Sequence, residues 1–406
     1  MQENNISEAN LERCLKCNLC TLVCPMMEVN PEYPGPKKAG PDGERYRLKD
    51  PAYYDYALKY CLNCKRCEVA CPSGVEIGDM IQLARIKYGS QAKRKGLHGL
   101  RDWTLASTDL VGSLSSPLAP VVNGVLAAKP VKAVLDGVLG VDRHRTFPAY
   151  SGQKFTSWFR RQDQSRFDKF VTYFHGCYVN YNYPQLGKDF VKVVNAAGYG
   201  VHLLEKEKCC GVALMSNGFA AKARRQGEVN LASMRKAVAA GEPVLTSSST
   251  CTFTMRDEYP HVLGLPNEDV RPSLMLLTKW LYGKVASGEV KLRFRSDFSM
   301  KAAYHTACHM QKLGWEYYSI ELLRMIPGLE LTVLDQNCCG ISGTFGFKKE
   351  NYVHSQNIGS KLFASILDAG VDAVLTDCET CKWQIEDGTG LPVLNPVSVL
   401  AQALED

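Results

Sequence analysis

Two copies of one short motif decide how the second half of this chain folds: "EKCCGVALMSNGF" at residues 207–219 and "QNCCGISGTFGF" at residues 336–347. Each copy places two adjacent cysteines before a glycine. Adjacent cysteines make an awkward disulfide because the ring that they close is small and strained. Glycine tolerates positive φ, so a bend at Gly211 or Gly340 lets both thiolates of a doublet face one site. We therefore expect each doublet to supply ligands to a metal centre.

The sequence around the doublets is also repeated. "YFHGCYV" at 173–179 matches "AYHTACHM" at 303–310, and "VLTSSSTCTF" at 244–253 matches "VLTDCETCKW" at 374–383. The matching cysteines stand 131, 129 and 130 positions apart. A constant offset over three separate stretches indicates an internal duplication.

Each half of the duplication alternates short β-branched runs with helical patterns. We expect strands at 171–174, 201–204 and 244–246 in the first half, and at 302–305, 331–334 and 373–376 in the second. Alternation of strand and helix predicts a mainly parallel sheet in each half. The cysteines follow the strands, at the edge where such sheets gather ligands.

The two halves supply two candidate cysteine sites that differ at one position. The first site comprises Cys177, Cys209, Cys210 and Cys251, and the second comprises Cys308, Cys338, Cys339, Cys378 and Cys381. Ser248 stands in the first half where the second has Cys378, so the type of the first cluster is left open, with the serine oxygen as a rarer ligand. Thiolates suit both iron–sulfur clusters and zinc, and zinc is the alternative here.

The N-terminal region carries two runs of the form C-x2-C-x2-C-x3-C-P, "CLKCNLCTLVCP" at 14–25 and "CLNCKRCEVACP" at 61–72. This spacing is typical of two-cluster ferredoxins, in which the fourth cysteine of each run binds the other cluster. The expected ligand sets are Cys14, Cys17, Cys20 and Cys71 for one [4Fe-4S] cluster, and Cys61, Cys64, Cys67 and Cys24 for the other. Structural zinc is again the alternative, although it does not require such a run.

Composition places the chain among soluble, intracellular proteins. It has 406 residues, 17 cysteines and a net charge of +6, which gives no argument for nucleic-acid binding. The polar N-terminus lacks the apolar core of a secretory signal, and a reducing compartment fits cysteines that bind metal. No G-x-G-x-x-G follows a predicted strand, so we expect no flavin or nicotinamide site on this chain, and no catalytic residue is assigned.

The segment between the two cysteine-rich regions has a different character. An uncharged stretch at 110–128 is followed by cations that include Arg143, Arg145 and Lys169. Pro117, Pro120 and Asn123 lower its hydrophobicity, so we do not expect a membrane-spanning helix. We interpret this segment first as a connector that packs against the protein's own core or a partner subunit. Apolar patches flanked by cations also suit an anionic membrane surface, which is the alternative.

These patterns divide the chain into four parts. Residues 1–95 form a mostly α-helical two-cluster ferredoxin domain, and 96–168 form a basic, amphipathic connector. Residues 169–290 and 291–406 form two α/β domains built around the doublets. The fold class is therefore multidomain, with a helical ferredoxin domain followed by a duplicated α/β region with mainly parallel sheets.

The doublet sites resemble the CCG domains of heterodisulfide reductase and related quinone- or disulfide-reducing proteins. In that family the five-cysteine site holds a non-cubane [4Fe-4S] cluster, which the resemblance implies for the second site. Over the whole chain, stretches such as "NPEYPGPKKAGPDGERYRLKD", "FHGCYVNYNYPQLGKD" and "CCGISGTFGFKKENY" resemble the iron–sulfur C subunits of anaerobic glycerol-3-phosphate dehydrogenases. The iron–sulfur subunits of glycolate and lactate oxidation share this layout and remain alternatives, as does heterodisulfide-reductase-like disulfide reduction.

The resemblance implies an electron-transfer subunit. Flavin-containing partner subunits would hold the dehydrogenation site and oxidise sn-glycerol 3-phosphate. This chain would pass the electrons through its clusters to menaquinone, as a peripheral protein on the cytoplasmic side of the inner membrane.

Overall fold

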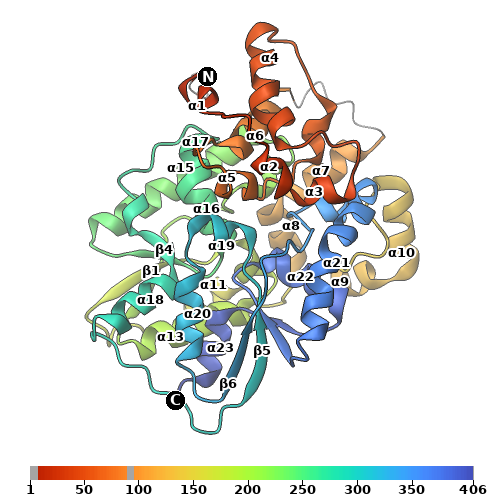
Figure 1. The fold of residues 1–406 in the computed structure, drawn as a ribbon. Coiled ribbons are helices and arrows are strands. Elements are labelled where there is room, and N and C mark those ends of the chain that lie inside the picture. Colours follow the sequence, from red (N-terminus) through yellow and green to blue (C-terminus); the bar gives the residue numbers. More distant parts are fainter. Residues whose placement is uncertain (1–7, 89–95, 406) are drawn as a thin grey trace.

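The computed structural model describes residues 8–88 and 96–405. Its N-terminal part lies across one end of two α/β units, and the connector helices run along one side (Figure 1). The N-terminal helices are α1 Glu8–Glu12, α2 Leu19–Leu22, α3 Pro25–Val29, α4 Gly43–Lys49, α5 Arg66–Val69 and α6 Ile77–Tyr88. The structure places no strand among the described residues of this part, in keeping with the predicted helical ferredoxin domain.

The first α/β unit contains a four-stranded sheet in the order β2-β1-β3-β4, and every strand pair is parallel. Its strands are β1 Phe170–Phe174, β2 Gly200–Leu203, β3 Val244–Thr246 and β4 Leu274–Leu276. Its helices are α12 Gly176–Tyr181, α13 Pro184–Ala196, α14 Val212–Ser216, α15 Ala220–Ala239, α16 Ser249–Phe253, α17 Tyr259–His261 and α18 Leu277–Ala286.

The second α/β unit repeats this arrangement, with the order β6-β5-β7-β8 and parallel pairing throughout. Its strands are β5 Met300–Tyr304, β6 Leu329–Val333, β7 Ala373–Leu375 and β8 Val393–Leu394. Its helices are α19 Cys308–Leu313, α20 Glu316–Arg324, α21 Tyr352–Asp368, α22 Glu379–Thr389 and α23 Pro396–Ala403. The predicted duplicated α/β fold with parallel sheets is confirmed.

The two sheets share one hydrophobic core. Buried side chains of both units belong to it, among them Tyr173 and Phe190 of the first and Tyr304 and Leu400 of the second. Helix α23, at the end of the chain, packs against α13 of the first unit. The two halves therefore stabilise each other.

The connector is helical and leaves much apolar surface exposed. Its helices are α7 His98–Ala106, α8 Thr108–Ser115, α9 Ala119–Ala127, α10 Lys129–Val134 and α11 Phe155–Phe159. Thr108–Ala127 is a 20-residue helical run, and an 18-residue stretch of it has a mean hydropathy of 1.4 and is 17% buried. By length and composition alone, the run is apolar enough to span a membrane. Such a single run is weak evidence for a span.

One connector cation packs into the protein's own core. Arg145, one of the cations after the uncharged stretch, is 1% exposed. Its guanidinium donates to the carbonyl of Gly346 at 2.6 Å and to Ser355 at 2.8 Å. Because these acceptors belong to the second α/β unit, Arg145 attaches the connector to that unit.

A buried charge network joins the N-terminal part to both α/β units. Lys65, between two cluster cysteines, contacts Asp79 and lies 3.5 Å from Glu68. Burial disfavours the charged ammonium, but the carboxylates of Asp79, Glu68 and Glu258 outweigh it and raise the pKa of Lys65. Burial alone would raise the pKa of Asp79, yet Lys65 and His261 lower it to about 2.

The same network reaches each α/β unit through hydrogen bonds. Asn63 donates to Glu258 of the first unit at 2.6 Å, and its carbonyl contacts the His309 ring of the second at 3.2 Å. Lys312 of the second unit lies 2.9 Å from Glu68. The loop that carries the second ferredoxin motif is therefore held by both units at once.

This network predicts a pH dependence of stability that His261 carries. The Asp79 carboxylate accepts a hydrogen bond from His261 at 3.2 Å and raises the pKa of that imidazole above 6.5. A raised pKa in the folded state adds stability that is present below about pH 6.5 and is lost as the pH rises through the folded value. The thermal midpoint of the anaerobic protein should therefore fall over that range, and His261→Gln should flatten the fall. His202→Gln, at an exposed histidine, is the control, and an unchanged slope in His261→Gln would contradict this role.

Candidate iron–sulfur centres

The two ferredoxin motifs fold into two small cavities, and each cavity is lined by one expected ligand set. Cys14, Cys17, Cys20 and Cys71 line one, and Cys24, Cys61, Cys64 and Cys67 line the other. Each cavity thus takes three cysteines from one motif and the fourth from the other. The structure thus brings together the four thiols of each expected set, and their binding of a cluster stays a prediction.

The loops between the cysteines adopt the same unusual backbone in both motifs. Lys16 and Asn18 have φ of 59° and 66°, and Asn63 and Lys65 have φ of 54° and 63°. Left-handed conformations cost non-glycine residues of order 1–2 kcal/mol each. Left-handed residues at every second position curl each loop around its cavity, whose lining includes the successive cysteines.

The cysteine thiols of the two cavities fit the cationic core of an iron–sulfur cluster. Burial, followed by the charge of Cys64, raises the pKa of the Cys24 thiol to about 12. Burial, together with Cys14, Cys17 and Cys71, likewise raises the pKa of Cys20. Thiolates packed this closely repel each other, so a complete set ionises only when a cation lies among them.

The first CCG site gathers its four cysteines at the carboxyl edge of the first sheet. Cys177 follows β1 and lies 3.7 Å from Cys209, sulfur to sulfur. Hydrogen bonds with Cys209 and Cys251 raise the pKa of the Cys210 thiol. Gly211 supplies the bend with a φ of 92°.

Two buried carboxyls that sequence patterns did not single out also line this site. Asp109 of α8 accepts a hydrogen bond from the Cys209 backbone at 2.7 Å, and burial raises its pKa to about 7. Glu207 accepts from the backbones of His175 and Gly176 at 3.2 and 2.7 Å. Asp109 has no motif that marks it, since only the packing of α8 on this unit brings it here, whereas Glu207 begins the quoted stretch that contains the first doublet.

The second CCG site brings its five cysteines together at the same edge of the second sheet. Cys339 and Cys381 lie 3.3 Å apart. The other thiols are close enough to shift the pKa values of their neighbours. Cys338 forms a hydrogen bond with Cys339, and Cys378 forms one with Cys381. Burial raises the pKa of Cys308, and the charges of Cys378 and Cys339 raise it further. Hydrogen bonding from Cys381 lowers the pKa of Cys378 to about 5, so this thiol favours the thiolate form.

The histidines near the two doublet sites differ in their surroundings. Burial lowers the pKa of His175 to about 4, so its imidazole is neutral. His309 bridges Thr250 and Asn63. His305 is 1% exposed, and one of its ring nitrogens lies within 4.8 Å of Cys339 and Cys381. Of these three histidines, His305 is therefore the one that is placed to bind a metal together with the cysteines.

Ser248 occupies a capping position. It is the N-cap of α16, where its side chain accepts from the Cys251 backbone at 3.3 Å and donates to Glu379 at 2.8 Å. Cys378 stands at the equivalent N-cap of α22, with no side-chain cap bond. The first unit therefore has a serine that caps a helix at the position where the second unit has a cysteine thiol.

The four sites lie in a contiguous order. Each ferredoxin set takes its fourth cysteine from the other motif. The charge of Cys64 in the second set helps to raise the pKa values of Cys308 and Cys338 in the second CCG site. Thr250, adjacent to Cys251 of the first CCG site, lies 3.5 Å from the Cys378 sulfur. The second ferredoxin site and the second CCG site thus occupy the middle of the series.

Comparison with known proteins agrees with this organisation. Residues 10–75 match the 4Fe-4S dicluster domain, and residues 171–256 and 302–386 match the cysteine-rich CCG domain. The chain is 24% identical to a subunit of the fumarate reductase (CoM/CoB) of Methanothermobacter marburgensis, over 98% of this chain and 73% of that protein. Among solved structures, glutamate racemase RacE1 of Bacillus anthracis aligns with a TM-score of 0.27 at 8% identity, over 58% of this chain and 79% of that one.

Fold and sites together define an iron–sulfur electron-transfer protein with a dicluster domain and two CCG domains. The chain is 55% identical to the C subunit of the anaerobic glycerol-3-phosphate dehydrogenase of Escherichia coli K12, over 98% of this chain and all of that protein. It belongs to that family of iron–sulfur subunits.

The bends at the doublets predict unequal effects of one substitution. A Cβ at Gly340, where φ is 87°, would collide with the carbonyl oxygen of Ser355, whereas at Gly211 it would meet the Ala223 side chain at 3.2 Å. We expect Gly340→Ala to remove the second CCG cluster, a loss of about four irons per chain. Gly211→Ala should keep its cluster and cost only the backbone strain, of order 1–2 kcal/mol. Iron analysis and EPR check this, and equal iron loss in both variants would contradict it.

The capping role of Ser248 gives a second prediction. Ser248→Ala should lower stability by about 1 kcal/mol through loss of the cap, with iron content unchanged. Cys251→Ser, the matched ligand change, should deplete iron at the first CCG site. If Ser248→Ala depleted iron as Cys251→Ser does, the serine oxygen would be a ligand instead.

Proposed function

We propose that this chain carries electrons from flavin-containing partner subunits, which oxidise sn-glycerol 3-phosphate, to menaquinone at the cytoplasmic face of a membrane. The observation that carries the proposal is the contiguous series of four cysteine sites in one chain. An electron can pass along such a series without diffusible intermediates. The clusters would supply one-electron chemistry, and the residues of this chain hold, space and shield them.

The absence of a nucleotide motif in the sequence supports a division of labour. Dehydrogenation of an alcohol removes two electrons at once, which flavins accept, whereas iron–sulfur clusters pass electrons singly. The relative from Escherichia coli is named as one part of a larger dehydrogenase. Partner subunits therefore provide the substrate site in this proposal.

An exposed apolar surface on the connector supports membrane contact. We call it the connector surface, and its exposed residues are Leu97, Leu100, Trp103, Leu110, Leu114, Leu118, Val121, Val125, Val134 and Val138. Exposed cations, among them Lys129 and Arg143, belong to the same connector. Apolar residues that lie in the headgroup region beside cations are characteristic of peripheral attachment to anionic membranes.

The proposed reaction is tested on the complex purified anaerobically with its partners. With sn-glycerol 3-phosphate as donor, the complex should reduce a menaquinone analogue such as menadione, and should do so only when this chain is present. A soluble dye should still be reduced by the partner subunits alone. Disulfide cleavage without quinone reduction would contradict the proposal and favour the heterodisulfide-reductase-like alternative.

Membrane attachment is tested on the connector surface. Leu114 is 67% exposed and Leu118 is 60% exposed, so replacing both with glutamate should leave the fold intact. Leu114→Glu with Leu118→Glu should weaken sedimentation with phosphatidylglycerol vesicles at least about tenfold, because carboxylates oppose both burial and the anionic surface. Leu367→Glu, at a leucine of α21 that is 56% exposed, is the control. Equal weakening by all variants, or none, would contradict the assignment of this surface.

A further inference from the structure

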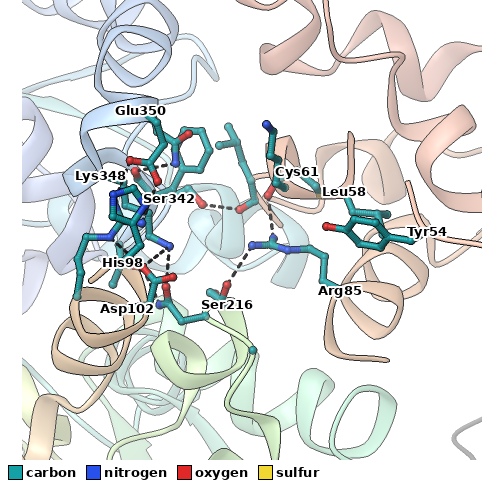
Figure 2. A pocket seen from close by; sticks show the side chains of 18 residues that line it. Tyr54, Leu58, Cys61, Arg85, His98, Asp102, Ser216, Ser342, Lys348 and Glu350 are labelled. Carbon is teal, nitrogen blue, oxygen red and sulfur yellow. Dashed lines mark hydrogen bonds and ion pairs between the residues drawn. The ribbon is translucent and has the colours of Figure 1, made fainter. Parts of the chain in front are cut away.

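A cavity of about 400 Å³ lies where all parts of the chain meet. Figure 2 shows Tyr54, Leu58 and Cys61 on one side, with His98, Lys348 and Glu350 on the other. Ser216 comes from the first α/β unit and Ser342 from the second. None of the four cysteine sites accounts for this cavity, although it touches one of them.

The cavity reaches a cluster through Cys61, an expected ligand of the second ferredoxin site. Arg85 donates to the carbonyl of Cys61 and to the carbonyl of Ser216, both at 3.0 Å. Ser342, three residues after the second doublet, donates to the carbonyl of Leu62 at 2.6 Å. A molecule in the cavity would therefore lie beside the backbone of a cluster-binding loop, with the second CCG loop forming another wall.

The walls combine flat apolar groups with hydrogen-bond donors. Tyr54, Leu58, Leu62 and Phe345 supply apolar surface. Lys348 lies 3.0 Å from Asp102 and donates to Asn217 at 2.8 Å, which accounts for two of its three N–H donors within the described part of the chain. His98 adds a ring nitrogen.

The charged groups on the wall that includes Glu350 pair with one another. Arg101 makes a two-pronged contact with Glu350, with both nitrogens 2.8 Å from the carboxylate oxygens. Lys348 faces Asp102. An anion at this wall would meet the carboxylates of Glu350 and Asp102, which already pair with the cations of the wall. A neutral carbonyl compound needs only hydrogen-bond donors.

Helix α7 connects the cavity to the connector surface. His98, Arg101 and Asp102 line the cavity, while Leu100 and Trp103 on the same helix are 51% and 38% exposed. Residues three and four apart share a helix face, so α7 presents a polar face inward and an apolar face outward. A ligand with a polar ring and a long apolar tail would find both parts accommodated.

We propose that this cavity binds the ring of a membrane quinone, with its tail leaving along the outer face of α7. This inference rests on the proposed function and adds the site at which the quinone is reduced. Each quinone would take two electrons, which originate in the partner subunits' substrate, and the cluster that Cys61 would help to hold would supply them one at a time. It also takes two protons from solvent, so both carbonyl oxygens become hydroxyls. His98 and Lys348 donate hydrogen bonds to those oxygens.

Photolabelling tests the location directly. The complete anaerobic complex in detergent is irradiated with an azido derivative of 1,4-naphthoquinone, and the labelled peptides are mapped. Label is expected within 54–62, 98–102 or 342–351, with protection by excess menadione and not by inorganic phosphate. Label elsewhere would overturn the cavity assignment, and protection by phosphate would make the cavity an anion site instead.

A variant at His98 tests the role of the donor. His98→Leu should raise the KM for menadione about tenfold, with dye-linked activity and iron content unchanged, and His98→Gln, which keeps a donor, should restore most of the affinity. His202→Leu, at an exposed histidine on β2, is the matched control. An unchanged KM in His98→Leu would overturn the role of His98. A wild-type complex that reduces no quinone would instead overturn the proposed function, so the two failures are distinguishable.

Discussion

The arrangement of the sites depends on the buried ion pairs that the ammonium of Lys65 makes with carboxylates. Lys65 lies in the loop between Cys64 and Cys67 and is surrounded by Asp79, Glu68 and Glu258, the last from the first α/β unit. Removing one partner from such a group leaves an uncompensated buried charge, which costs about 3–5 kcal/mol. The cluster loop and the unit against which it packs therefore form together. The same loop contacts the second α/β unit through Asn63 and His309 and through Glu68 and Lys312, which keeps the second ferredoxin site against the second CCG site.

Duplication explains the similarity of the two CCG sites, and packing explains their divergence. Both sheets have the same strand order, and both doublets end in a glycine with positive φ. Around the first site the connector supplies Asp109, and Ser248 caps a helix where the second copy has a thiol. The second copy keeps all five cysteines and lies against the ferredoxin cluster. One fold thus provides a four-thiol site and a five-thiol site in different positions of the same series.

Much of this organisation could be predicted from spacing alone, because cysteine motifs fix which side chains must meet. The ferredoxin sets and the parallel sheets follow from short-range patterns and match the cavities and strand pairs. The edge strands β4 and β8 were not predicted: unlike the other strands, neither is followed by a cysteine motif that marks where it ends. The burial of Arg145 could not be predicted from its sequence position, because only the tertiary fold brings Gly346, Ser355 and Gln384 around it. The cavity beside Cys61 arises from segments far apart in sequence, and no local signal marks it.

The central claim is that four clusters form one contiguous series with the second ferredoxin site beside the second CCG site. Anomalous X-ray diffraction at the iron absorption edge, on crystals of the anaerobically purified protein, locates iron directly. Four iron peaks are expected, one at each cysteine set, with the peak among Cys24, Cys61, Cys64 and Cys67 adjacent to the peak at Cys338 and Cys339. Zinc in place of iron at the doublets, or a ferredoxin peak remote from the second CCG peak, would contradict it.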